Sequence, residues 1–309
     1  MNYRNSFARF SRFISLFVFV VILAGGVVRM TQSGMGCPDW PKCFGNWIPP
    51  VSVTQLPLNY KELYAFKYVD TSFNPYHTWI EYINRLLGAL LGLFLVIQFL
   101  WSLRFWKTDK KIVWLCVANL LLTGFQGWLG SKVVEANLEV FKVTTHMLVA
   151  LLIAALSVTV VYRTSNHENV VISKKLRYLT WLAILLMIIQ IILGTQVREQ
   201  VDHIALSLHF EQRNLWISRL GNVFYIHRSF SVLVALICFY LFIQYRRIQG
   251  LSKSAWQILA CVAVLICLGF TMAYFNIPAI AQPLHLLFSS MLIIIVYYNS
   301  LRTRATVIS

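Results

Sequence analysis

Eight apolar segments constrain this chain more than any other feature of its sequence. Each contains about 20 consecutive residues dominated by apolar side chains, the length that an α-helix needs to cross the hydrocarbon core of a bilayer. The chain is 58% hydrophobic and only 12% charged, a composition that excludes an ordinary soluble domain. We therefore predict an all-α polytopic membrane protein with eight transmembrane helices. The segments begin near Phe10, Tyr82, Ile112, Thr144, Tyr178, Phe224, Ala255 and Ile280.

The net charge of +16 is distributed by topology. Lysine and arginine gather in alternate connections, and the opposite connections hold most of the acidic residues. By the positive-inside rule the basic connections are cytoplasmic, so we expect a multi-pass protein of the cell (inner) membrane with both termini in the cytoplasm. The charge implies the lipid bilayer as a partner and does not imply nucleic acid. The basic connections contain Arg104, Lys107, Lys110, Lys111, Arg163, Lys174, Lys175, Arg177, Arg246, Arg247 and Lys253.

Short strings recur in the two halves of the chain, which indicates an internal duplication. Both sets of four spans start on the cytoplasmic side, so we expect two pseudo-symmetric four-helix bundles related by an axis along the membrane normal. The boundary falls in a short polar connection, giving halves of residues 1–165 and 166–309. The matched strings are 25–29 (Gly-Gly-Val-Val-Arg) with 194–198 (Gly-Thr-Gln-Val-Arg), 82–85 (Tyr-Ile-Asn-Arg) with 225–228 (Tyr-Ile-His-Arg), and 145–148 (Thr-His-Met-Leu) with 284–287 (Leu-His-Leu-Leu).

Four polar residues occupy matched positions of this repeat: Asn84, His146, His227 and His285. By topology they lie at one depth, in the first turns of spans 2, 4, 6 and 8. A histidine inside a bundle marks a functional site by default, although any single one could simply hydrogen-bond across helices. The matched pairing favours a shared function.

The second half offers a pair of ligands for a planar cofactor. His227 and His285 come from two helices of one expected bundle and could approach a haem iron from opposite sides. Zinc is less favoured, because it usually takes three or four ligands and the second half has no further histidine or cysteine at this depth. Nearby arginines either pair with haem propionates or extend to the membrane interface. They are Arg198 and Arg228, with Arg29 and Arg85 in the first half.

A carboxylate distinguishes the first half from the second. Glu81 lies one helical turn before Asn84, whereas its counterpart in the second half is Phe224. A carboxylate beside a desolvated cofactor suits general acid–base catalysis or charge stabilisation. The competing interpretation is an ion pair with Arg85, four residues further along the helix.

The first outer loop contains two cysteines, Cys37 and Cys43. They face an oxidising compartment, where disulfides persist, so we predict a structural disulfide. A redox-active pair is the alternative, and it would require a tuned thiol environment. This loop (residues 30–78) and the third outer loop (199–223) are longer than a connection requires, which is typical of lids and binding elements.

Taken together, these residues resemble the haem A synthase family. The resemblance covers almost the whole chain and rests on the eight spans, Glu81-x-x-Asn84-Arg85, the three histidines, the Gly-x-x-x-Arg ends of spans 1 and 5, and the cysteine pair. Such proteins are oxidoreductases that convert a methyl group of haem O to a formyl group through a hydroxymethyl intermediate, giving haem A for terminal oxidases.

The resemblance implies a role for each half. The second half would hold a permanent haem b between His227 and His285, near Arg198 and Arg228. The first half would bind haem O through His146, with Asn84, Arg85 and Arg29 nearby and Glu81 essential at the reacting methyl group. Haem O synthase and terminal-oxidase assembly factors are the implied protein partners.

One position departs from the family pattern. Family members usually have histidine where this chain has Asn84, so the substrate iron would be five-coordinate or weakly held by the amide. His77 is another candidate ligand, but it lies two helical turns away, about 10 Å along a helix. Two rival functions remain at this point: a di-haem electron-transfer cytochrome, which has no need of Glu81, and a non-enzymatic haem carrier.

Overall fold

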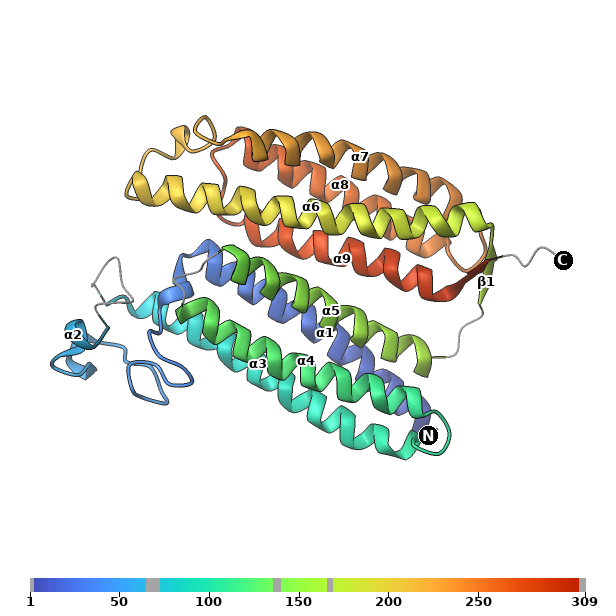
Figure 1. Ribbon diagram of the computed structural model, residues 1–309, viewed down its shortest axis with the longest axis horizontal. Coiled ribbons are helices and arrows are strands. Elements are labelled where there is room, and N and C mark those ends of the chain that lie inside the picture. The colour runs from blue at the N-terminus through green and yellow to red at the C-terminus, as the bar shows by residue number, and fades with distance from the viewer. Residues whose placement is uncertain (1–2, 65–72, 136–139, 166–168, 306–309) are drawn as a thin grey trace. The chain divides into compact units, whose positions relative to one another are not determined.

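The computed structural model describes residues 3–64, 73–135, 140–165 and 169–305 (Figure 1). Within them, eight helices are long and apolar enough to cross a membrane, which confirms the predicted all-α polytopic membrane fold. The membrane helices are α1 (Tyr3–Met30), α3 (Pro75–Ser102), α4 (Lys110–Glu135), α5 (Val140–Thr164), α6 (Lys174–Ser207), α7 (Asn222–Tyr245), α8 (Ser252–Tyr274) and α9 (Ala281–Arg302).

The remaining elements are short. A small helix lies in the first loop, and two strands, β1 and β2, pair in parallel, with Val170 opposite Thr303. The short elements are η1 (Ser33–Met35), η2 (Val53–Gln55), α2 (Tyr60–Tyr64), η3 (Leu103–Phe105), η4 (Arg213–Leu215), β1 (Val170–Ile172) and β2 (Thr303–Ala305).

Several helices extend beyond the apolar segments that predicted them. Helix α3 begins at Pro75 rather than near Tyr82, because Asn74 caps it by accepting the main-chain N–H groups of Tyr76 and His77. Helix α6 continues past Arg198 to Ser207, so the third loop is shorter than predicted. Hydropathy marks the part of a helix that crosses the membrane, whereas capping groups and polar pairs determine where the helix ends.

One compact unit comprises Met1–Ser15 and Ala154–Ser309. Within it, α6 contacts α7, α7 contacts α8, and α9 contacts both α8 and α6, so these four helices close a bundle. Its interior is mostly apolar and includes the fully buried Leu241, Ile258 and Val296. A hydrogen bond of 2.5 Å between the hydroxyl groups of Thr180 and Tyr245 joins α6 to α7.

The second unit comprises Leu16–Ile153. Helix α3 contacts α4, and Phe17 of α1 packs edge-to-face against Phe94 of α3 with ring centroids 5.2 Å apart. Gln126 of α4 hydrogen-bonds to the main chain of α5. The predicted division between residues 165 and 166 falls beside residues 166–168, which lie outside the described residues, so that boundary stays a prediction.

Candidate functional site

A disulfide between Cys37 and Cys43 closes the loop that follows α1, as predicted. Both cysteines are fully buried, and Phe44 packs with them in a small apolar cluster. Inside the loop, the carboxylate of Asp39 accepts the main-chain N–H groups of Phe44 (2.6 Å) and Gly45 (2.8 Å). Gly45 has φ +78, a conformation that favours glycine. The loop is therefore a compact element with its own core and its own hydrogen bonds.

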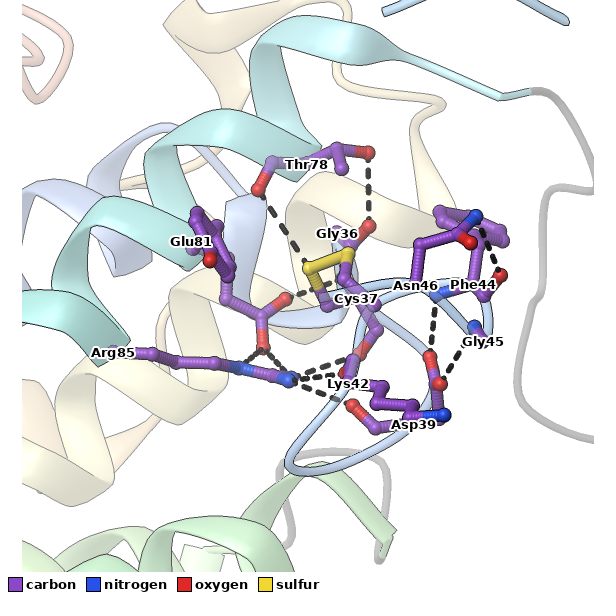
Figure 2. Close-up of a disulfide and its surroundings, with 12 residues drawn as sticks. Gly36, Cys37, Asp39, Lys42, Phe44, Gly45, Asn46, Thr78, Glu81 and Arg85 are labelled. Carbon is purple, nitrogen blue, oxygen red and sulfur yellow. Dashed lines mark hydrogen bonds and ion pairs between the residues drawn. A yellow bond between two sulfur atoms is a disulfide. The ribbon is translucent and has the colours of Figure 1, made fainter. Parts of the chain in front are cut away.

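Glu81 and Arg85 fasten this loop to α3 (Figure 2). One carboxylate oxygen of Glu81 accepts the main-chain N–H of Cys37 at 2.7 Å, and the other accepts the Arg85 guanidinium at 2.5 and 3.1 Å. Arg85 also donates to the carbonyl oxygens of Cys37 (3.0 Å), Asp39 (2.6 Å) and Lys42 (3.1 Å). The expected ion pair is present, and Glu81 is only 4% exposed. Its carboxylate is thus held in a single position.

A close backbone approach completes the attachment. The hydroxyl of Thr78 donates to the carbonyl of Gly36 at 2.9 Å. A Cβ atom at Gly36 would overlap the main-chain carbonyl oxygen of His77, so only glycine fits there. The first turns of α3 and the disulfide loop therefore form one structural element that presents Glu81.

The three histidines have similar local environments. They lie near the N-terminal ends of α5, α7 and α9, as predicted, and are His146, His227 and His285. Each imidazole lies against a glycine of the preceding helix, where an added Cβ atom would contact the ring carbon Cε1. The pairs, with that Cβ–Cε1 distance, are Gly130–His146 (3.3 Å), Gly194–His227 (3.2 Å) and Gly269–His285 (3.9 Å).

These imidazoles have the properties expected of axial ligands. The Nδ1 atoms of all three are buried and have no hydrogen-bond partner among the described residues. A buried polar atom without a partner is costly, and a bound group that orders the ring would offset that cost. His227 and His285 belong to the same four-helix bundle, on α7 and α9. A haem iron with two imidazole ligands fits this pair.

Asn84 differs from the histidines in two ways. It lies further along its helix than predicted, because α3 begins at Pro75. The glycine matched to Gly194 by the repeat is Gly25, where an added Cβ atom would meet nothing within 4 Å. The side-chain oxygen of Asn84 is buried and unpaired within the described part of the chain.

The arginines that were expected near propionates have varied surroundings. Arg198 pairs with Asp202 at 2.7 Å and donates to the side chain of Gln282. Arg228 is exposed and stacks over two aromatic rings of its own helix. Arg29 is half-buried in the last turn of α1. Arg85 binds the disulfide loop, a role that the sequence did not predict.

His77 lies in the first turn of α3, and the helix runs unbroken from there to Asn84.

Two contacts of the histidines were not predicted from the sequence. Gln126 and Gln190 contact the main chain of two of the candidate ligand histidines. The sequence carries one signal for them, a Gln-x-x-x-Gly pattern that occurs before both His146 and His227.

Comparison with known families settles the relationship of the chain. The model of the family COX15-CtaA, described as cytochrome oxidase assembly protein, matches residues 8–297. The chain belongs to this family. The match confirms the relationship that the sequence resemblance indicated.

Curated relatives are about 30% identical to this chain over the aligned residues. The heme A synthase of Shewanella oneidensis is 30% identical over 186 residues, which cover 59% of this chain and 54% of the relative. The heme A synthases of Bartonella tribocorum and Bradyrhizobium diazoefficiens are 29% and 28% identical, covering 60% of this chain and 55% and 54% of those proteins. The chain thus spans about half the length of the curated relatives it matches.

Proposed function

We propose that this chain is a haem A synthase, an oxidoreductase that converts a methyl group of haem O to a formyl group through a hydroxymethyl intermediate. The observation that carries the proposal is the difference between two matched sites. One unit contains the pair His227 and His285, and the other has His146, Asn84 and the fixed carboxylate of Glu81. A protein that only transferred electrons between two like haems would need that carboxylate only to hold the disulfide loop.

The C-terminal half, residues 166–309, is the proposed haem b site. His227 and His285 would be its axial ligands, because both rings have a buried nitrogen without a partner among the described residues. Arg198 and Arg228 would pair with its propionates. When bound, haem supplies one-electron chemistry.

The N-terminal half, residues 1–165, is the proposed substrate site. His146 would ligate the iron of haem O, and Asn84 would leave the opposite position open or weakly held. Arg29 and Arg85 lie toward the same end of the repeat and are the propionate candidates. Arg85 would have to give up contacts to take this role, because its N–H groups already bind Glu81 and the carbonyls of the disulfide loop. Glu81 would take up a proton or stabilise positive charge at the reacting methyl group, since its oxygens are already oriented by Cys37 and Arg85.

The cellular setting is also a proposal. The basic connections support an inner-membrane location with cytoplasmic termini. Haem O synthase would supply the substrate, and terminal-oxidase assembly factors would receive the product.

A paired experiment tests the assignment. Purified protein should show a six-coordinate, low-spin haem spectrum that His227→Ala or His285→Ala abolishes. Glu81→Gln should keep that spectrum while conversion of haem O collapses. An unchanged spectrum in both histidine variants would remove the haem b site, and wild-type conversion by Glu81→Gln would reduce Glu81 to an ion-pair partner. Haem binding without any conversion of haem O by the wild-type protein would favour the cytochrome alternative.

A further inference from the structure

Two glutamines lie in the same position relative to a candidate axial histidine, one in each unit. Gln126 precedes Gly130 by one helical turn on α4, and Gln190 precedes Gly194 by one turn on α6. Residues four apart share a helix face, so each glutamine lies on the face whose glycine contacts a histidine ring. The same arrangement is present within each of the two compact units.

The glutamine side chains bind the histidines directly. The Gln126 amide donates to the carbonyl oxygen of His146 at 2.9 Å. The Gln190 amide donates to the carbonyl oxygen of His227 at 3.1 Å, and its nitrogen lies 3.5 Å from the ring nitrogen Nε2 of the same residue. One side-chain amide therefore reaches both the backbone and the imidazole of His227.

In each glutamine–histidine pair, the amide oxygen and one ring nitrogen have no hydrogen-bond partner among the described residues. The side-chain oxygens of Gln126 and Gln190 are buried without a hydrogen-bond partner in the described ranges, and so are the Nδ1 atoms of His146 and His227. A histidine that ligates a metal through one ring nitrogen offers the N–H of the other, and an acceptor for that N–H fixes the ring and makes it a stronger electron donor. The unpaired amide oxygen of each glutamine, on a side chain that already binds the histidine backbone, is the candidate for such an acceptor.

We propose that Gln126 and Gln190 are positioning residues for the axial histidines. In each, the amide N–H holds the histidine backbone and the amide oxygen accepts the N–H of the ring nitrogen that is not on iron. This inference rests on the proposed haem sites. It assigns each haem one oriented, electron-rich ligand, His146 in the first half and His227 in the second.

The other two helix pairs lack this device. Leu265 precedes Gly269 by one turn on α8, and Val21 precedes Gly25 by one turn on α1. His285 therefore has no glutamine at the matched position, and neither does Asn84. In the substrate half, His146 would stay oriented while the Asn84 side remains free for exchange of haem O and haem A.

The test uses the midpoint potential of the C-terminal haem in the purified full chain. An electron-rich imidazole stabilises Fe(III), so Gln190→Leu should raise the potential, with a change of about tenfold in the Fe(III)/Fe(II) ratio at fixed potential, or about 59 mV for a one-electron couple. Gln190→Glu, which retains an acceptor, should remain at or below the wild-type potential. Leu265→Gln should lower the potential by giving His285 an acceptor.

Two outcomes separate this proposal from the proposed function. Gln257→Leu, which changes an exposed glutamine of α8, is the matched control and should leave the potential unchanged. Equal potentials in wild type, Gln190→Leu and Leu265→Gln would overturn the positioning role while the haem site stands. Absence of any haem spectrum in the wild-type protein would overturn the proposed function itself. If Gln190→Leu does not fold, the Leu265→Gln shift decides.

Discussion

Replacing Arg85 by leucine should free the disulfide loop from α3. The Cys37–Cys43 disulfide is fully buried, so a reductant reaches it only when the loop opens locally. Arg85→Leu removes the ion pair with Glu81 and the donors to three main-chain carbonyls. Breaking a buried ion pair costs about 3–5 kcal/mol. Because the Arg85 side chain is 14% exposed, we take the lower value, about 3 kcal/mol, which corresponds to about a 100-fold larger open fraction.

The rate of disulfide reduction measures this opening. Purified protein is treated with dithiothreitol, and the released thiols are labelled with a maleimide over time and counted by mass spectrometry. A Cys267→Ser background removes the exposed free thiol of α8. Arg85→Leu should accelerate reduction about 100-fold, whereas Arg228→Leu, at the matched position of the repeat, should not change it. Reduction of the Arg85 variant within about threefold of the wild-type rate would refute this reasoning.

Two further predictions concern the glycines and Asn84. Gly194→Ala would place a Cβ atom 3.2 Å from the ring of His227 and should lower haem b occupancy in absorption spectra. Gly25→Ala should not lower it, because nothing lies within 4 Å of the added Cβ atom. Equal haem b occupancy in the two variants would contradict the contact. Asn84→His should create a second low-spin haem that co-purifies more tightly, and the variant should convert haem O more slowly, because exchange must then break two strong axial bonds. A single low-spin haem in that variant would show that the side chain does not reach the iron.

The sequence predicted the features that depend on composition and spacing. Eight apolar segments gave eight helices, and two cysteines six residues apart in one loop gave a disulfide. It did not predict where helices end, since the start of α3 at Pro75 depends on the Asn74 cap and the end of α6 at Ser207 lies beyond the apolar segment that predicted the helix. It also missed the main-chain partners of Arg85, because carbonyl oxygens of a folded loop leave no residue pattern.

The repeated Gln-x-x-x-Gly pattern shows a different limit. Gln126 and Gln190 are visible in the sequence as a recurring pair. Their acceptors are backbone atoms of His146 and His227, which only the packing of α4 on α5 and of α6 on α7 identifies. Repeats therefore located the histidines, and the structure was needed to find what holds them.

Haem composition of whole cells tests the central claim most directly. Cells that make haem O but lack a haem A synthase are grown with and without this chain, and their extracted haems are separated by chromatography. The proposed function predicts that haem A appears only when the chain is present and that Glu81→Gln cells accumulate haem O instead. Haem O alone in cells that contain the folded, haem-loaded wild-type protein would contradict the account.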